Sequence, residues 1–278
     1  KLNPSFFDIE KLIIDTAEFF AEKAHGKGLE LNAYVDPECP PAVEADKNRL
    51  RQILVNLMGN AIKFTEEGEI NVRLTVQDRD DETVDLHLEV GDTGEGISRD
   101  DQETIFDEFA QTDESSTREQ SGTGLGLSIS QNLVEKMEGT IGVESELGEG
   151  STFFIEVSLP YREEPVEDSV LPDVELDRLE GHSVLIVDDN TTNREILTKY
   201  LQPQGVEVST CQNGQEALDQ LAEDSTFDVI FLDNRMPGIN GYDVIDRLPG
   251  DYRPDDVVML TSDGMRKSRT KAREYELG

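Results

Sequence analysis

The sequence predicts two α/β domains in series. The first is an α+β sandwich, a mixed sheet with helices on one face, and the second is a doubly wound, flavodoxin-like parallel sheet. The length of 278 residues is close to two domains of ordinary size. Hydrophobic residues (36%) together with 22 glycines match a globular composition. The first part mixes paired strands with amphipathic helices, whereas the second alternates strand and helix, as parallel sheets do.

The elements of the first domain follow from the spacing of apolar residues. Helical spacing predicts a helix over 9–24, with Phe19 and Phe20 both on its buried stripe. Asp46 precedes a longer helical pattern over 47–63 and suits its N-cap position. The remaining elements predicted here are strands over 29–35, 69–77, 83–91, 140–144 and 152–158, and helices over 102–109 and 125–137.

An acidic segment over 161–181 separates the two domains. It holds eight acidic residues and two prolines and shows little periodicity, which predicts an extended linker. The predicted domains are therefore 1–160 and 182–278. In the second, strands are predicted over 183–188, 206–211, 228–232 and 256–261, and helices over 193–201, 215–222, 242–248 and 265–276.

Composition and charge exclude several classes of protein. Sixty-one acidic against 25 basic residues give a net charge of −36, which opposes sequence-independent binding to nucleic acid or anionic lipid. No window approaches 18 consecutive apolar residues, so we expect no membrane span and a cytoplasmic location for this region. Cys39 and Cys211 are too few for a disulfide framework and fit a reducing compartment.

Two amides lie in the helix predicted over 47–63. Asn56 and Asn60 are four residues apart and share one face, with Lys63 beside it. Neutral carboxamide oxygens suit Mg²⁺, which takes its other ligands from water and nucleotide phosphates. Taken alone, the pair is explained more simply as amides that cap or bridge neighbouring elements.

A second motif, Asp92-Thr-Gly-Glu-Gly96, directly follows a predicted strand. Gly94 and Gly96 allow the backbone to approach a ligand closely. A carboxylate at the strand end can accept a hydrogen bond from an exocyclic amine such as that of adenine. A simple turn at the aspartate and glycine is the alternative explanation of this motif.

A third motif, Phe106-Asp-Glu-Phe109, places two aromatic rings on one helical face. Taken alone, Phe109 would be explained as a core residue.

A glycine-rich loop, Gly122-Thr-Gly-Leu-Gly-Leu127, opens the helix predicted over 125–137. Such a loop can bind phosphate through free backbone N–H groups. It is neither a Walker loop nor a dinucleotide fingerprint, because its spacing is GxGxG and no Lys-Ser/Thr follows. Arg118 lies just upstream, within reach of a phosphate, and the polar stretch over 111–121 suits a lid.

Together, in this order, the motifs resemble the ATP-binding domain of sensor histidine kinases, a fold shared with gyrase and MutL-type ATPases. The resemblance covers residues 1 to about 160. It implies that Asp92 recognises adenine, that Asn60 holds Mg²⁺ and that Asn56 supports it. Lys63 and Arg118 would contact phosphates. The other ATP-binding positions it implies are Gly94, Gly96, Phe109, Gly122, Thr123, Gly124, Leu125 and Gly126, with the last three glycines as a lid hinge.

Three carboxylates follow strands of the second domain. Asp188 and Asp189 end its first strand and Asp233 ends its third, so they meet at the carboxyl edge of the sheet, where ligands bind in such folds. Clustered carboxylates repel one another unless a cation joins them, and octahedral Mg²⁺ suits this donor set. In so acidic a chain, loop caps are the alternative.

The surrounding sequence, Val184-Leu-Ile-Val-Asp-Asp-Asn190 and Phe231-Leu-Asp-Asn-Arg-Met-Pro-Gly-Ile-Asn-Gly241, resembles a response-regulator receiver domain. The resemblance implies that Asp233 is the nucleophile that forms an acyl phosphate. It implies that Mg²⁺ is held by Asp188, Asp189, Asp233 and the backbone carbonyl of Arg235, and that Thr261 is the conformational switch. Receivers continue with a fifth strand, a lysine and a fifth helix, so we expect a receiver truncated at its C-terminus.

The two resemblances together indicate a hybrid sensor histidine kinase with ATP and Mg²⁺ as its cofactors. His25, His87 and His182 do not fit the phosphoacceptor pattern. We therefore expect an upstream helical hairpin, outside this sequence, to carry the acceptor histidine and to form a homodimer. A downstream phosphotransfer or response-regulator protein would receive the phosphoryl group, and membrane attachment of the full-length protein stays open.

Two alternatives to a phosphotransferring kinase stay open. A pseudokinase would bind nucleotide and signal without phosphotransfer. A gyrase- or MutL-type ATPase would need a glutamate general base where Asn56 stands, and an amide cannot act as that base.

Overall fold

A computed structural model of the chain describes residues 1–107, 124–166, 180–223, 227–250, 252–253 and 256–260. The chain divides into two compact units, Lys1–Val170 and Leu171–Gly278. Among the described residues, no helix combines the length and the hydropathy needed to cross a membrane.

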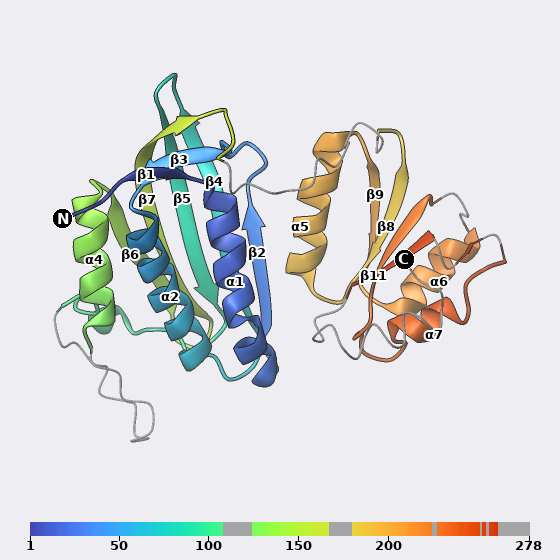
Figure 1. Cartoon of the computed structure of the whole chain (residues 1–278). Coiled ribbons are helices and arrows are strands. Elements are labelled where there is room, and N and C mark those ends of the chain that lie inside the picture. Colours follow the sequence, from blue (N-terminus) through green and yellow to red (C-terminus); the bar gives the residue numbers. More distant parts are fainter. Residues whose placement is uncertain (108–123, 167–179, 224–226, 251, 254–255, 261–278) are drawn as a thin grey trace. The chain divides into compact units, whose positions relative to one another are not determined.

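Unit 1 is a seven-stranded mixed sheet with helices packed on one face (Figure 1). Its elements are β1 (Ser5–Phe7), α1 (Ile9–Gly26), β2 (Glu30–Val35), β3 (Ala42–Ala45), α2 (Lys47–Phe64), β4 (Glu69–Arg79), β5 (Thr83–Asp92), α3 (Arg99–Gln102), α4 (Gly126–Lys136), β6 (Thr140–Glu146) and β7 (Gly150–Arg162). The strand order is β1-β3-β7-β5-β4-β2, with β6 also paired to β7. β2 and β4 are parallel and the other pairs are antiparallel.

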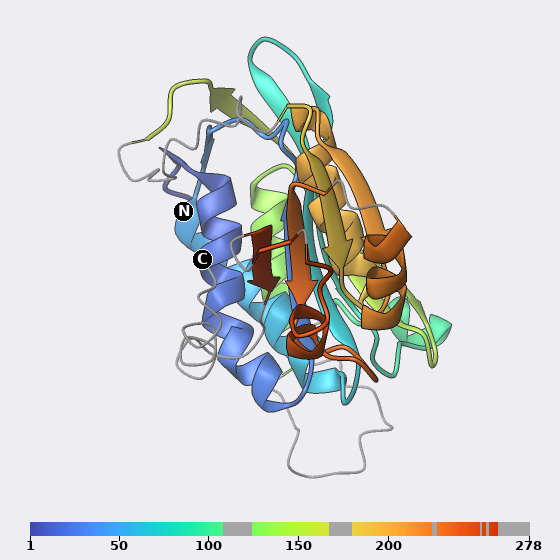
Figure 2. The same ribbon diagram turned by 90° about the vertical axis from the view of Figure 1, so that its right-hand side faces the viewer.

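Burial in unit 1 is one-sided. Alternate residues of β4 and β5, such as Ile70, Val72 and Leu88, are buried under α1 and α2, which run side by side along that face (Figures 1 and 2). α2 begins where predicted, because the Asp46 carboxylate accepts a hydrogen bond from the Arg49 N–H at 3.1 Å and caps the helix. The predicted α+β sandwich with one covered face is therefore confirmed.

Two predictions for unit 1 are wrong in detail. Phe19 is 74% exposed, whereas Phe20 is 6% exposed. Successive helical residues point about 100° apart, so Phe19 turns to solvent once Phe20 faces the core. The helix expected over 102–109 is instead the single turn α3, because the Ser98 hydroxyl accepts from the Asp101 N–H and starts the helix earlier. The last two residues of that expected helix lie outside the described part of the chain.

Unit 2 is a four-stranded parallel sheet with the strand order β11-β10-β8-β9. Its elements are β8 (Ser183–Val187), α5 (Thr191–Leu201), a 3₁₀ turn (Gln202–Gln204), β9 (Glu207–Cys211), α6 (Gly214–Glu223), β10 (Val229–Asp233), α7 (Gly241–Ile245) and β11 (Val257–Leu260). Along β8, Leu185 and Val187 join the core that includes α6 and α7, while Val184 and Ile186 join the core that includes α5. Helices therefore cover both faces, which confirms the doubly wound prediction (Figure 1).

The helix expected over 242–248 is shorter than predicted, because α7 ends at Ile245 and turns follow. Pro249 disfavours helical geometry in the residue before it, so the helix stops early. The helix expected over 265–276 lies outside the described residues.

Candidate nucleotide and cation sites

The two amides predicted for the first site lie on α2. Asn56 Nδ2 donates to the Ser130 hydroxyl of α4 at 3.1 Å, and that hydroxyl donates to the Gly126 carbonyl at 3.0 Å. A side chain at Gly126 would overlap the Asn56 carboxamide, so the glycine allows α4 to begin against α2. Ser130, which is 1% exposed, was missed by the sequence analysis, because its partner lies 74 residues away.

The carboxyl end of α2 borders a hollow of about 360 Å³. Lys63, Phe64, Thr93 and Gly94 line it with three glutamates, Glu66, Glu67 and Glu95. The Lys63 ammonium lies 4.4 Å from the centre of the Phe64 ring. The structure thus brings Lys63 and the Asp92-Thr-Gly motif to one place, although the two are about thirty residues apart in sequence.

Asp92 ends β5 beside this hollow. Its Oδ1 accepts a hydrogen bond from the Gly94 N–H at 2.9 Å. Burial raises the pKa of the Asp92 carboxyl, and hydrogen bonds from the backbone of Gly94 and Ser151 oppose that rise. A carboxylate held in this way can accept one more hydrogen bond from a neutral amine.

Glycines hold the loop after Asp92 in a tight space. A Cβ at Gly94 would lie 2.5 Å from the Phe64 carbonyl oxygen and 2.9 Å from Asp92 Oδ1. Gly96 has φ +71°, and a side chain there would overlap the Glu146 carbonyl. Gly150, to which sequence reasoning assigned no role, packs in the same way against the backbone of Asp92.

Several predicted residues lie outside the described part of the chain: Phe109, Arg118, Gly122, Thr123 and Thr261. Of the glycine-rich loop, Gly124 has φ +67°, Leu125 precedes α4, and Gly126 begins it. The described end of that loop therefore lies at the N-terminus of a helix that contacts α2.

The three predicted carboxylates of unit 2 come together. Ligand oxygens of Asp188, Asp189 and Asp233 all lie within 4.8 Å of one another. They meet because β8 and β10 are neighbouring parallel strands, so their carboxyl ends share one edge. Asp188 is 2% exposed, whereas Asp189 is exposed. This donor set is the kind that binds a hard divalent cation.

Three hydrogen bonds to these carboxylates were not predicted. Asp188 Oδ1 accepts from the Asn190 N–H at 2.8 Å, and Asp188 Oδ2 accepts from Asn193 Nδ2 at 3.1 Å. Asp233 Oδ2 accepts from the Arg235 N–H at 3.0 Å. A sequence signal for Asn193 did exist, since it lies one helical turn after the Asn190 cap.

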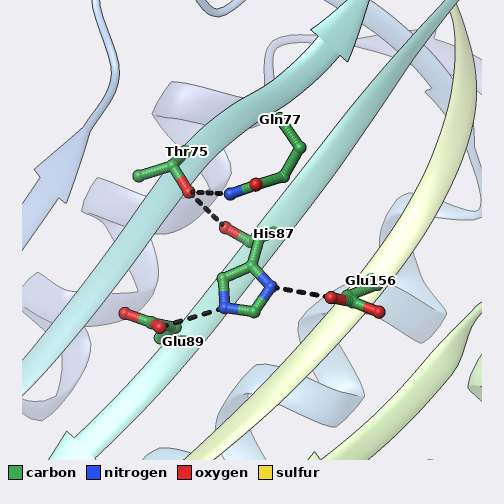
Figure 3. A network of polar contacts seen from close by, with 5 residues as sticks. All are labelled: Thr75, Gln77, His87, Glu89 and Glu156. Atoms are coloured by element: carbon green, nitrogen blue, oxygen red, sulfur yellow. Dashed lines mark hydrogen bonds and ion pairs between the residues drawn. The ribbon is translucent and has the colours of Figure 1, made fainter.

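His87 is held on the open face of the unit 1 sheet (Figure 3). Its Nε2 lies 3.0 Å from Glu89 Oε1 and its Nδ1 3.4 Å from Glu156 Oε1, and its ring stacks on Phe154. The histidine thus lies in a strand between two carboxylates. His87 therefore does not have the helical setting that the resemblance implies for a phosphoacceptor.

Comparison with known proteins gives the same division of the chain. Residues 45–162 match the family of histidine kinase-, DNA gyrase B- and HSP90-like ATPases, and residues 184–277 match the response regulator receiver domain. The chain is 41% identical over 212 residues to the sensor histidine kinase GacS of Pseudomonas protegens, covering 76% of this chain and 22% of GacS.

Two further relatives are similar. The autoinducer 2 sensor kinase/phosphatase LuxQ of Vibrio vulnificus is 39% identical over 221 residues, which are 78% of this chain and 25% of LuxQ. The sensory/regulatory protein RpfC of Xanthomonas campestris is 31% identical over an alignment of 288 positions, which covers 92% of this chain and 39% of RpfC. The chain therefore spans well under half the length of these relatives.

Among solved structures, full-length ShkA in complex with AMPPNP is similar, with a TM-score of 0.75 and 31% identity. The likeness covers 99% of this chain and 54% of ShkA. Both units of the chain thus have counterparts in one solved protein.

Proposed function

The chain joins a histidine kinase-type ATPase domain to a receiver domain and is homologous to hybrid sensor histidine kinases. From this premise we propose that the whole protein passes the γ-phosphoryl group of ATP to a histidine and then to Asp233. The observation that carries the proposal is the meeting of Asp233 with Asp188 and Asp189. It supplies a nucleophile and a cation-binding donor set at one strand edge. Relatives named sensor kinases do not favour the pseudokinase or the gyrase-type alternative.

In the first unit, Asp92 would accept a hydrogen bond from the adenine amino group. Asn60, supported by Asn56, would hold the Mg²⁺ that accompanies ATP, while Lys63 and Arg118 would contact its phosphates. Mg²⁺ would neutralise charge on the phosphates, and the protein would contribute positioning. Gly94, Gly96 and Gly126 fit this proposal, because a Cβ at any of them would overlap neighbouring atoms. Gly124 fits it through its positive φ of +67°.

In the second unit, a carboxylate oxygen of Asp233 would attack the phosphorus of a phosphohistidine. The phosphorus–nitrogen bond breaks, its electron pair stays on the imidazole, and an acyl phosphate forms on Asp233. Asp188, Asp189 and the Arg235 carbonyl would hold Mg²⁺ there, and Thr261 would bind the phosphoryl group. The acceptor histidine, a homodimer and a downstream phosphate acceptor belong to the same proposal for the whole protein.

Calorimetric titration of Mg-ATP tests the nucleotide half. A hydrogen bond to a charged group contributes about 1.5–3 kcal/mol, so Asp92→Asn should weaken binding roughly ten-fold or more. Asn60→Ala should weaken binding of ATP only when Mg²⁺ is present. Asp85→Asn, an exposed carboxylate on the same strand, and Asn48→Ala, an exposed amide on α2, are the matched controls. Equal affinity in Asp92→Asn and wild type would place the nucleotide elsewhere.

Phosphorylation by acetyl phosphate tests the receiver half. Incorporation of label that alkali or hydroxylamine releases, as expected of an acyl phosphate, should disappear in Asp233→Asn and persist in Asp228→Asn, whose carboxylate lies at the other end of β10. Labelling that survives Asp233→Asn would refute the assignment of the nucleophile.

A further inference from the structure

The junction between β8 and α5 concentrates its polar contacts on one residue, Asp188. The Asn190 N–H and the Asn193 amide each donate to a different carboxylate oxygen of Asp188, at 2.8 Å and 3.1 Å. The Arg194 guanidinium donates to the Asp188 carbonyl at 2.7 Å and to the Thr191 hydroxyl at 3.0 Å. Two of the three donors to Asp188, the Asn193 amide and the Arg194 guanidinium, come from the first turn of α5, and the third comes from the N-cap residue Asn190. Together they contact both the backbone carbonyl and the carboxylate of Asp188.

We propose that Asn193 is a positioning residue for the cation site: its carboxamide holds the Asp188 carboxylate in the orientation that binds the metal. This inference rests on the proposed function, because it takes the three carboxylates to be a Mg²⁺ site. Asn193 itself acts through Asp188.

The need for such a residue follows from burial and charge. Asp188 is 2% exposed, yet its carboxylate lies close to two others, so without donors it would lose both hydration and a favourable orientation. Each carboxylate oxygen has two lone-pair directions. A donor on each oxygen therefore fixes how the Asp188 carboxylate is turned, with its ligand oxygen within 4.8 Å of those of Asp189 and Asp233.

The contributions of backbone and side chain can be separated by mutation. The donor from Asn190 is its backbone N–H, which survives any substitution except proline, whereas the donor from Asn193 is its side chain. The Asn190 side chain instead caps α5 by accepting from the Asn193 N–H at 3.2 Å. Asn190→Ala therefore removes a helix cap and keeps the contact to Asp188, while Asn193→Ala does the reverse.

The test uses the whole chain without nucleotide, so that the ATP-associated metal position stays empty. Mn²⁺ is titrated by the loss of its free electron paramagnetic resonance signal, and Mg²⁺ then competes for the same position. Metal binding that is lost in Asp188→Asn is assigned to the receiver site. This separates it from diffuse binding to the acidic surface. Thermal unfolding of each variant is measured in parallel.

Asn193→Ala should weaken Mn²⁺ and Mg²⁺ binding at this position by roughly 10- to 100-fold, the usual effect of losing a residue that orients a metal ligand. Asn193→Leu, which keeps the volume and removes the donor, should behave alike. Asn190→Ala should lower the unfolding temperature and leave the metal affinity within about two-fold of wild type, since its contact to the carboxylate is unchanged.

The other outcomes overturn different statements. Wild-type affinity in Asn193→Ala, with binding lost in Asp188→Asn, overturns the positioning role and leaves the proposed function intact. Equal weakening in Asn190→Ala and Asn193→Ala also overturns it, because the effect then comes from helix packing. Wild-type binding in both Asp188→Asn and Asp233→Asn overturns the cation site itself.

Discussion

Gly94→Ala is a direct test of how the loop after Asp92 is built. The new methyl carbon would lie 2.5 Å from the Phe64 carbonyl oxygen and 2.9 Å from Asp92 Oδ1. The first distance is about 1 Å inside the ~3.5 Å at which non-bonded atoms attract. Gly94 does not have a positive φ, so the effect of alanine comes from space and not from backbone strain.

This overlap must be relieved by moving the loop away from the end of α2. Because the Phe64 carbonyl belongs to the helix, the loop and the Asp92 carboxylate are the parts able to shift. Overpacking of this kind costs about 1–3 kcal/mol in the free energy of unfolding. If half or more of that displaces Asp92 from its ligand geometry, nucleotide affinity falls by roughly three- to ten-fold.

The assay combines calorimetric unfolding with Mg-ATP titration. The two units have separate cores, so the unfolding transition of unit 1 is identified as the one that Mg-ATP shifts to higher temperature. Gly26→Ala is the control, since a Cβ there meets nothing within 4 Å. Wild-type melting and nucleotide affinity in Gly94→Ala would refute the reasoning.

Three further predictions follow from single groups. Burial raises the pKa of Asp92, so the folded chain binds a proton there more tightly than the unfolded chain does. The free energy of unfolding should therefore fall as pH rises from the usual aspartate range through the raised pKa. Denaturant titrations at several pH values measure this slope, which Asp92→Asn should remove. Lys27→Met should lower the unfolding free energy of unit 1 by about 1 kcal/mol, because the Lys27 ammonium donates to carbonyls at the C-terminal end of α2, and Lys23→Met, with no such contact, should change it less. Burial raises the pKa of the Cys39 and Cys211 thiols to about 12, so iodoacetamide at pH 8 should label both slowly in the folded chain and rapidly in urea; fast labelling of the folded chain would contradict this.

Local signals in the sequence were sufficient for most elements of the fold. The Asp46 cap and the alternation along β4 and β5 are properties of short stretches, and the structure confirms them. β1 and β3 were missed because three or four residues are too few to show a period of two, and their pairing depends on residues far along the chain. Phe19 was misplaced because it lies at the margin of a helical stripe, where only tertiary packing decides which ring is buried.

The candidate sites divide in the same way. The carboxylates at 188 and 233 could be brought together from sequence, because the first and third strands of a doubly wound sheet are neighbours and their carboxyl ends share an edge. The roles of the Ser130 and Asn193 side chains did not follow from the sequence, although Asn193 lies one helical turn after the Asn190 cap. The first depends on how α4 packs against α2, and the second depends on the side-chain orientation of a polar residue in the first turn of a helix.

Two aspartates of the same chain are held in opposite ways, and this difference matches the ligands proposed for them. Asp92 is half-buried among backbone donors, and its raised pKa means that the surroundings disfavour its charge. Such a group suits a neutral hydrogen-bond donor such as an amine of a base. Asp188 is more deeply buried, but two other carboxylates lie within 4.8 Å of it. The negative charge of three carboxylates this close together is stabilised by a divalent cation far more than by a neutral hydrogen-bond donor. Aspartate should therefore select a base in unit 1 and a metal in unit 2.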